Sequence, residues 1–152
     1  MSYEDNKSKN TILVEGQEMA LNRAYNQYKE NSIFTARPEE LTLLLYNGLI
    51  KFIMQGQLAI DEKDIEKAHN SLIRAQDIVN EFQVSLDKKY EIFNSLALLY
   101  DYMHRRLIEA NIKKDKEILA EILGYAKELR DAWAQAMKIA RQHMRPEPVK
   151  EV

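Results

Sequence analysis

The fold is decided by residues 64–86, which read DIEKAHNSLIRAQDIVNEFQVSL. Apolar side chains recur along them with alternating spacings of three and four residues: Ile65, Ala68, Leu72, Ala75, Val79, Phe82 and Leu86. This spacing is typical of a helix that packs one face along a partner helix. Asp64 stands directly before the first apolar residue and is a favoured N-cap. The stretch therefore predicts a helix that begins after Asp64 and belongs to a bundle.

Other segments of the chain carry the same helical period. They cover about residues 17–30, 38–62, 90–111 and the residues that follow Asp115. Pro38 suits the first position of its helix and Asp115 is a good N-cap for the last one. The connections 61–64 and 111–115 are short, and short connections place successive helices antiparallel. We predict an all-α fold, an antiparallel up-and-down four-helix bundle with an additional short N-terminal helix.

The inward faces of the two later helices follow from their apolar stripes. In the segment 90–111 the stripe is interrupted by Arg106 and consists of Ile92, Leu96, Leu99, Met103 and Ala110. In the last segment it consists of Leu119, Ile122, Ala126, Leu129, Trp133, Ala136 and Ala140. We expect both stripes to face the core.

Composition limits the class of protein and the domain organisation. A chain of 152 residues favours a single domain, and four glycines with three prolines leave few helix breakers. The absence of cysteine excludes disulfides and thiolate catalysis. The near balance of 22 basic and 24 acidic residues speaks against a dedicated nucleic-acid binder. We expect a flexible N-terminal extension over 1–16, a bundle domain over 17–144 and a disordered tail over 145–152.

Residues 41–60 are long and apolar enough to be a marginal membrane span. Thr42, Asn47, Gln55 and Gln57 would need partners within lipid, however, and no basic cluster flanks the segment. Residues 1–10 are polar and do not form a signal peptide. We therefore expect a buried bundle helix, no membrane insertion and a cytoplasmic protein.

A helical bundle with Glu-x-x-His motifs invites a comparison with carboxylate-bridged dimetal sites. Two near matches occur, Glu66 with His69 and Asp101 with His104. The apolar stripes place Glu66 and Asp101 away from the core, so a dimetal oxidase is only a remote alternative. No nucleophile motif or phosphate-binding loop occurs. We expect no enzyme, no catalytic residue, no metal site and no cofactor.

The helix predicted over 38–62 carries more apolar surface than one bundle face needs. Its core stripe is expected to be Leu41, Leu44, Leu45, Gly48, Leu49, Phe52 and Ala59. A second stripe comprises Leu43, Tyr46, Ile50, Ile53 and Met54, and further apolar residues outside the core stripes include Leu98, Tyr102 and Ile108. The surplus has two compatible interpretations. It is covered by the protein itself, through the first helix, residues 12–14 or a homodimer partner, or it is a groove for a peptide of another protein.

Several motifs resemble one known family in their order along the chain. They are YNQY at 25–28, NSI at 31–33, TARPEEL at 35–41, LYNG at 45–48, IRAQDIVNEF at 73–82, LYDYM at 99–103 and ELRDAW at 128–133. Together they resemble the flagellar export chaperones that bind flagellin, the FliS family. Arg37 and Asn47 depart mildly from the family pattern, and about twenty residues precede its usual start.

The resemblance implies a cytoplasmic helical chaperone that binds the C-terminal segment of flagellin, prevents premature polymerisation and presents the subunit to the flagellar type III export apparatus. It implies that the export gate is contacted when the client is bound. Tyr25 and Tyr28 would then serve as an N-terminal self-cover or an export contact. The client groove is expected to comprise Leu43, Tyr46, Ile50, Ile53, Met54, Leu98, Tyr102 and Ile108. A homodimerising bundle protein is the structural alternative.

Overall fold

The structure, a computed structural model, describes residues 37–89 and 91–144 and contains four α-helices there. They are α2 (Pro38–Asp61), α3 (Ile65–Ser85), α4 (Phe93–Lys113) and α5 (Lys116–Met144). These helices confirm the all-α class and the four long helices of the predicted bundle. The predicted helix over 17–30, and with it Tyr25 and Tyr28, lies outside the described residues. The domain boundaries stay predictions.

Local chemistry sets the beginnings and ends of the helices. The carboxylate of Asp64 accepts a hydrogen bond from the Lys67 backbone N–H at 3.1 Å and caps α3, as predicted. Asp115 does the same for α5 by accepting from the Glu117 N–H at 2.9 Å. Lys63 and Lys114 adopt positive φ angles of 59° and 51°, and these left-handed residues turn the chain sharply. The two short connections therefore reverse the chain within a few residues.

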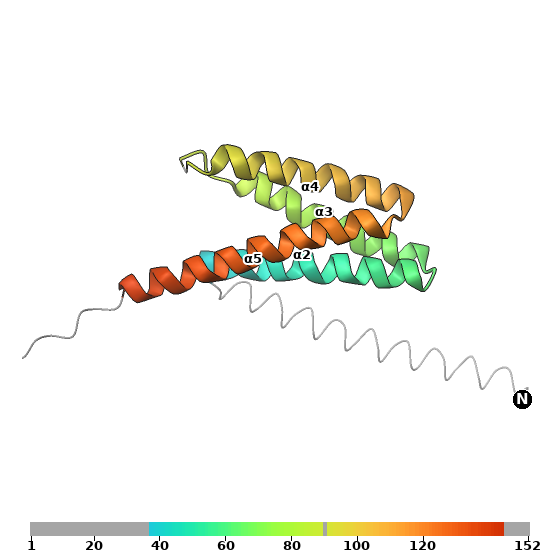
Figure 1. Ribbon diagram of the computed structural model, residues 1–152, viewed down its shortest axis with the longest axis horizontal. Coiled ribbons are helices and arrows are strands. Elements are labelled where there is room, and N and C mark those ends of the chain that lie inside the picture. The colour runs from blue at the N-terminus through green and yellow to red at the C-terminus, as the bar shows by residue number, and fades with distance from the viewer. Residues whose placement is uncertain (1–36, 90, 145–152) are drawn as a thin grey trace, which may run out of the picture. The chain divides into compact units, whose positions relative to one another are not determined.

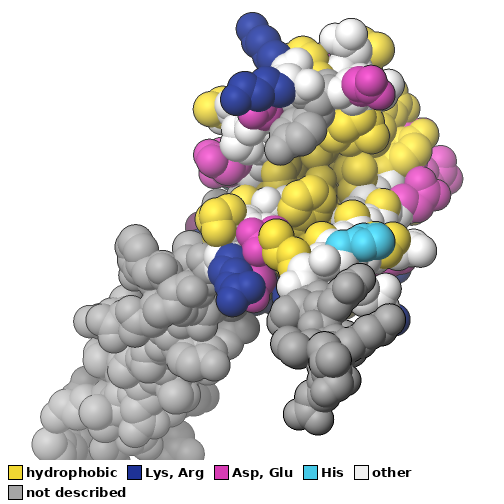
Figure 2. Space-filling model, turned by 90° about the vertical axis from the view of Figure 1, so that its left-hand side faces the viewer, with side chains coloured by type: hydrophobic (Ala, Val, Ile, Leu, Met, Phe, Trp, Pro, Cys, Tyr) yellow, Lys and Arg dark blue, Asp and Glu magenta, His cyan; other side chains and the backbone are white. Residues whose placement is uncertain are grey.

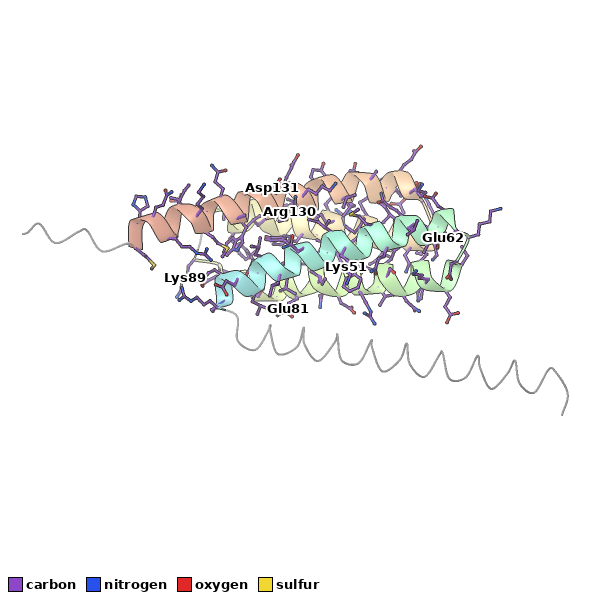
Figure 3. All side chains as sticks on the ribbon, turned by 90° about the horizontal axis from the view of Figure 1, so that it is seen from below. Lys51, Glu62, Glu81, Lys89, Arg130 and Asp131 are labelled. Carbon is purple, nitrogen blue, oxygen red and sulfur yellow. The ribbon has the colours of Figure 1, made fainter. Side chains whose placement is uncertain are left out.

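Within residues 42–144 the helices are arranged around one core. α3 packs along α4, and α4 packs along α5. Figures 1 and 3 show α2 and α4 on opposite sides of this bundle, with α3 and α5 between them. Lys116 at the start of α5 pairs with Asp61 at the end of α2 at 2.5 Å, which ties the two short connections together. The largest fully buried side chains are Leu49, Ile53, Leu72, Val79, Met103, Leu107, Leu119 and Ile122.

The inward faces of α3 and α5 largely follow the predicted stripes. On α3, all predicted positions between Ala68 and Phe82 are buried, and only the first residue, Ile65, is exposed. On α5, the stripe is correct as far as Ala126, but Ala136 is exposed and Met137 is buried instead. A strict seven-residue repeat rotates by about 20° per heptad on a straight helix. By the third heptad this rotation has moved the buried face by one residue.

On α2 the predicted core stripe is right at Leu49 and Ala59, which are fully buried, but its phase is otherwise shifted. The buried residues are Tyr46, Leu49, Ile50, Ile53, Gly56 and Ala59. Leu44, assigned to the core, is 44% exposed. Because apolar residues occur nearly all around this helix, its hydrophobic period could not indicate which side faces the neighbouring helices.

Two glycines of α2 allow close packing against α3. A Cβ at Gly56 would lie 2.7 Å from Cδ2 of Leu72, and one at Gly48 would lie 3.3 Å from Cδ1 of Ile78. Any side chain at Gly56 would therefore overlap a fully buried leucine. The small size of this residue sets how closely α2 approaches α3.

An aromatic stack connects α2, α3 and α4 within the core. The Phe82 ring lies 4.5 Å from the Tyr46 ring and 5.4 Å from the Tyr100 ring, measured between centroids. The hydroxyls of Tyr46 and Tyr100 are hydrogen-bonded to each other at 2.7 Å. The two phenols thus satisfy each other in the core, as buried polar groups require.

We expect this tyrosine pair to make the fold sensitive to alkali. Burial raises the pKa of both phenols above the ordinary value of 10, and for Tyr100 the hydrogen bond to Tyr46 raises the pKa further. The unfolded chain loses these protons from about pH 10 upward while the folded chain keeps them, so the free energy of unfolding falls as the pH rises above 10. One tyrosine contributes at most about 1.4 kcal/mol per pH unit.

Urea unfolding between pH 8 and pH 11 measures this slope. In the double variant Tyr46→Phe with Tyr100→Phe, no buried phenol is left unpaired, and the alkaline loss of stability should be clearly smaller than in the unmodified chain. Equal slopes for the two proteins would contradict the assignment.

Candidate functional site

The residues predicted to line a groove do not form one surface. Tyr46, Ile50 and Ile53 are 5%, 6% and 0% exposed and belong to the core. Their assignment to an open groove was therefore wrong, for the same reason that the phase of α2 was wrong. Met54 is 50% exposed, and Leu43 is half-buried. On α2 only these two of the predicted residues are accessible.

The three predicted groove residues of α4 are accessible to different degrees. Leu98 is 74% exposed and Ile108 is 37% exposed, whereas Tyr102 is half-buried. Tyr46 of α2 and Tyr100 of α4 meet across the core, so the outward faces of the two helices point away from each other. Met54 and Leu98 thus lie on opposite sides of the bundle, and no single groove contains both.

Instead of one groove, the described residues form two separate exposed apolar faces. The α2 face, as we name it, consists of Leu44, Met54 and Leu58, which are 44–54% exposed. The α4 face consists of Leu98, Ile108 and Ile112, which are 37–79% exposed. Sequence reasoning missed Leu58 and Ile112. Their spacing of four residues from Met54 and Ile108 indicated the shared faces.

A third apolar region lies at the end of the bundle where α2 and α4 begin. Figure 2 looks onto this end and shows hydrophobic side chains gathered in its middle, with charged side chains around them. Partly buried residues that pack against the core and come from this end include Leu45, Leu86, Leu96 and Trp133. The α2 and α5 helices also border a shallow pocket of about 270 Å³ lined by Leu43, Ala134, Met137, Lys138, Arg141 and Gln142.

A polar cluster joins α4 to α5 beside the α4 face. The Tyr102 hydroxyl donates to Glu121 Oε1 at 2.6 Å, and this bond raises the pKa of Tyr102. Arg106 donates to Glu109 Oε2 at 2.5 Å and its Nε lies 3.8 Å from Glu121. Lys113 and Arg106 lower the pKa of the Glu109 carboxyl. Arg106, which interrupts the predicted stripe, is therefore held at the α4–α5 boundary by two carboxylates, while Tyr100 and Leu107 fill the core.

The two Glu-x-x-His-like motifs are engaged in ordinary interactions. His69 Nδ1 and the Asn111 amide are hydrogen-bonded at 3.1 Å between α3 and α4. Asp101 accepts a hydrogen bond from Arg105 at 3.0 Å on the outside of α4. Among residues 37–89 and 91–144, no three His, Cys, Asp or Glu side chains gather in a way that could hold a metal ion.

One helix of the described part, Pro38–Asp61, has the length and composition of a membrane span. The core helix of a bundle meets the same criterion. Its apolar residues Leu49, Ile53 and Ala59 are fully buried against the other helices. This packing accounts for part of its apolar character, since 33% of its apolar window is buried within the structure.

Comparison with known proteins gives a consistent result. Residues 21–140 match the family described as flagellar protein FliS. A flagellar secretion chaperone FliS of Bacillus subtilis (strain 168) is 46% identical over 124 residues, which cover 82% of this chain and 93% of the relative. The flagellar secretion chaperone FliS of Salmonella typhimurium is 31% identical over 117 residues, covering 74% and 87%.

A solved structure also resembles this one. It is described as a crystal structure of a flagellar chaperone from bacteria and superposes with a TM-score of 0.63. The likeness covers 76% of this chain and 96% of the other, at 19% identity. It supports the helical-bundle fold.

Proposed function

This chain belongs to the FliS family of flagellar secretion chaperones. From that premise we propose that it binds the C-terminal segment of flagellin in the cytoplasm, prevents premature polymerisation and delivers the subunit to the flagellar type III export apparatus. Family membership supports a protein client rather than a small-molecule substrate. The cytoplasm follows from the proposal, because a client is held by its chaperone before export.

The observation that best supports a disordered client is the presence of two exposed apolar faces on opposite sides of one bundle. The α2 face and the α4 face each present several apolar side chains to solvent. A rigid globular partner docks on one side, whereas a segment that folds on binding can wrap around a large surface. We therefore propose that the client contacts both faces and not one groove. Leu43, Met54, Leu98, Tyr102 and Ile108 remain the accessible members of the expected groove.

Calorimetric titration of the full-length chain with a peptide of the flagellin C-terminal segment tests this function. We expect a dissociation constant in the tens of micromolar or tighter, and a negative heat-capacity change because apolar surface is buried. Replacing both Met54 and Leu58 by Asp, or both Leu98 and Ile108 by Asp, should weaken binding by about tenfold or more, since apolar anchors are converted to charges.

The matched control is Ile139→Asp on α5. Ile139 is 47% exposed, close to the 50% of Met54, but it belongs to neither face. It should bind the peptide like the unmodified chain. Absence of binding by the unmodified chain would reject flagellin as the client, and equal weakening by all three variants would show that the two faces are not the contact surface.

A further inference from the structure

A polar pocket lies between α2 and α3, near the short connection that joins them. Its volume is about 300 Å³. Phe52 supplies an aromatic ring to its lining, and Gln55, Asn70 and Ser71 add two amides and a hydroxyl. Gln55 is half-buried, Asn70 is exposed and Ser71 is buried. The pocket therefore offers hydrogen-bonding groups at several depths beside an aromatic side chain.

The Ser71 hydroxyl lacks a partner in the structure. Ser71 is 6% exposed, and among residues 37–89 and 91–144 its hydroxyl makes no hydrogen bond. By contrast, the Ser85 hydroxyl on the same helix donates to the Glu81 carbonyl at 2.8 Å. A buried polar group without a partner is costly, and most such groups have one. Because Ser71 lines the pocket, a group bound there would supply the missing partner.

The charges around the pocket do not favour a charged ligand. Asp64 and Glu66 supply two negative charges, and Lys67 and Arg74 supply two positive ones. Asp64 is engaged in capping α3, and the Arg74 guanidinium lies 5.5 Å from the centre of the Phe52 ring. A ligand of either sign would be attracted by one pair and repelled by the other. The pocket therefore fits a neutral group that both donates and accepts hydrogen bonds.

The pocket borders the α2 face. Gln55 directly follows Met54 and precedes Leu58 by three residues on α2. A segment that packs apolar side chains on Met54 and Leu58 therefore brings its neighbouring side chains close to the pocket. Binding surfaces commonly combine apolar contacts with a few hydrogen-bonding groups that provide specificity.

We propose that this pocket binds the carboxamide of an asparagine or glutamine side chain of the client segment that lies on the α2 face. The carboxamide oxygen accepts a hydrogen bond from the Ser71 hydroxyl. The carboxamide nitrogen donates to the side-chain oxygen of Gln55 or Asn70, and the aliphatic part of the side chain packs on Phe52. The identity of the client rests on the proposed function, whereas the chemistry of the bound group rests on the pocket.

Three small compounds of similar size test this chemistry without any flagellin peptide: propionamide, propionate and propylammonium. Each is titrated into the ¹⁵N-labelled full-length chain and followed by NMR. Propionamide should shift the backbone signals of residues 70, 71 and 74 in a saturable way, with a dissociation constant of about 10–100 mM, as expected for so small a ligand. The two charged compounds should bind at least about threefold more weakly.

Two variants test the residues of the pocket. Ser71→Ala removes the unpartnered hydroxyl, and Gln55→Met removes an amide while keeping the length of the side chain. Each should weaken propionamide binding by about threefold to tenfold, the range expected for one hydrogen bond. Ser85→Ala on the same helix is the matched control and should bind propionamide like the unmodified chain. Circular dichroism of each variant checks that it is folded.

The proposal is overturned if propionamide shows no saturable binding up to about 300 mM, or if either charged compound binds more tightly. Unchanged propionamide binding by both Ser71→Ala and Gln55→Met would also overturn it.

Calorimetry with the flagellin peptide then tests the client separately. Ser71→Ala should weaken peptide binding by about threefold or more, and an unchanged affinity would show that the client does not use the pocket. If the unmodified chain binds propionamide but not the peptide, flagellin is rejected as the client while the chemistry of the pocket is supported.

Discussion

Replacing Ile53 by Asp is expected to unfold the bundle, whereas the same replacement at the adjacent Met54 leaves it folded. Ile53 is fully buried in the core, and Met54 is 50% exposed on the α2 face. A carboxylate at position 53 has no basic partner among the apolar side chains of the core cluster. A buried charge without a partner costs about 4 kcal/mol or more, which is comparable to the whole stability of a domain of this size.

Circular dichroism and urea unfolding measure this pair of variants. Ile53→Asp should lose most of its helical signal at 25 °C, and Met54→Asp should keep both its signal and its urea midpoint. Ile53→Val, which removes one methylene, should cost only about 0.5–1.5 kcal/mol and shows that the position tolerates apolar residues. If Ile53→Asp keeps its native helicity, this side of α2 is open to solvent. That result would support the sequence-based prediction of a groove there.

Gly56→Val should have the second largest effect on stability. The first atom of any side chain at this position would lie 2.7 Å from Cδ2 and 3.1 Å from Cγ of Leu72. Leu72 is fully buried, so it cannot move aside without displacing the core. Forcing α2 away from α3 should reduce the free energy of unfolding by about 3 kcal/mol, at the upper end of overpacking effects. The gain in helix propensity from Gly to Val offsets only a few tenths of this.

Gly124→Val is the matched control within the same chain. A Cβ at Gly124, which is also within a helix, would meet nothing within 4 Å. This variant should be neutral or slightly stabilising in urea unfolding, because glycine is the poorer helix former. If Gly56→Val and Gly124→Val unfold at the same urea concentration, the close approach of α2 and α3 is not limited by Gly56.

The sequence predicted the fold class because several elements combined period with capping. α3 has both a strict apolar repeat and a capping aspartate, and its buried face and its start were predicted correctly. α5 has the same combination, and the prediction failed only in its later turns, where the repeat rotates away from the core. On α4 the sequence contained two apolar stripes with different phases. The stripe that is buried consists of Tyr100, Met103, Leu107 and Ala110. The predicted stripe instead ran through Leu96, Leu99 and Met103.

The inward face of α2 was predicted less well, because α2 carries apolar residues on nearly every side. A pattern of this kind shows that a helix has neighbours on several sides but not which side each neighbour covers. The inward side of α2 is shown by the hydrogen bond of Tyr46 to Tyr100 and by the approach of Gly56 to Leu72, which the sequence of α2 alone does not reveal. Membership in the FliS family, by contrast, was evident from motifs that extend over most of the chain.

The two short connections described above have a kinetic consequence. Because α3, α4 and α5 each pack along the helix that precedes or follows them, many core contacts join residues that are close in sequence. Proteins with such local contacts fold within microseconds to milliseconds. By the same rule, this bundle is expected to reach its native state soon after synthesis.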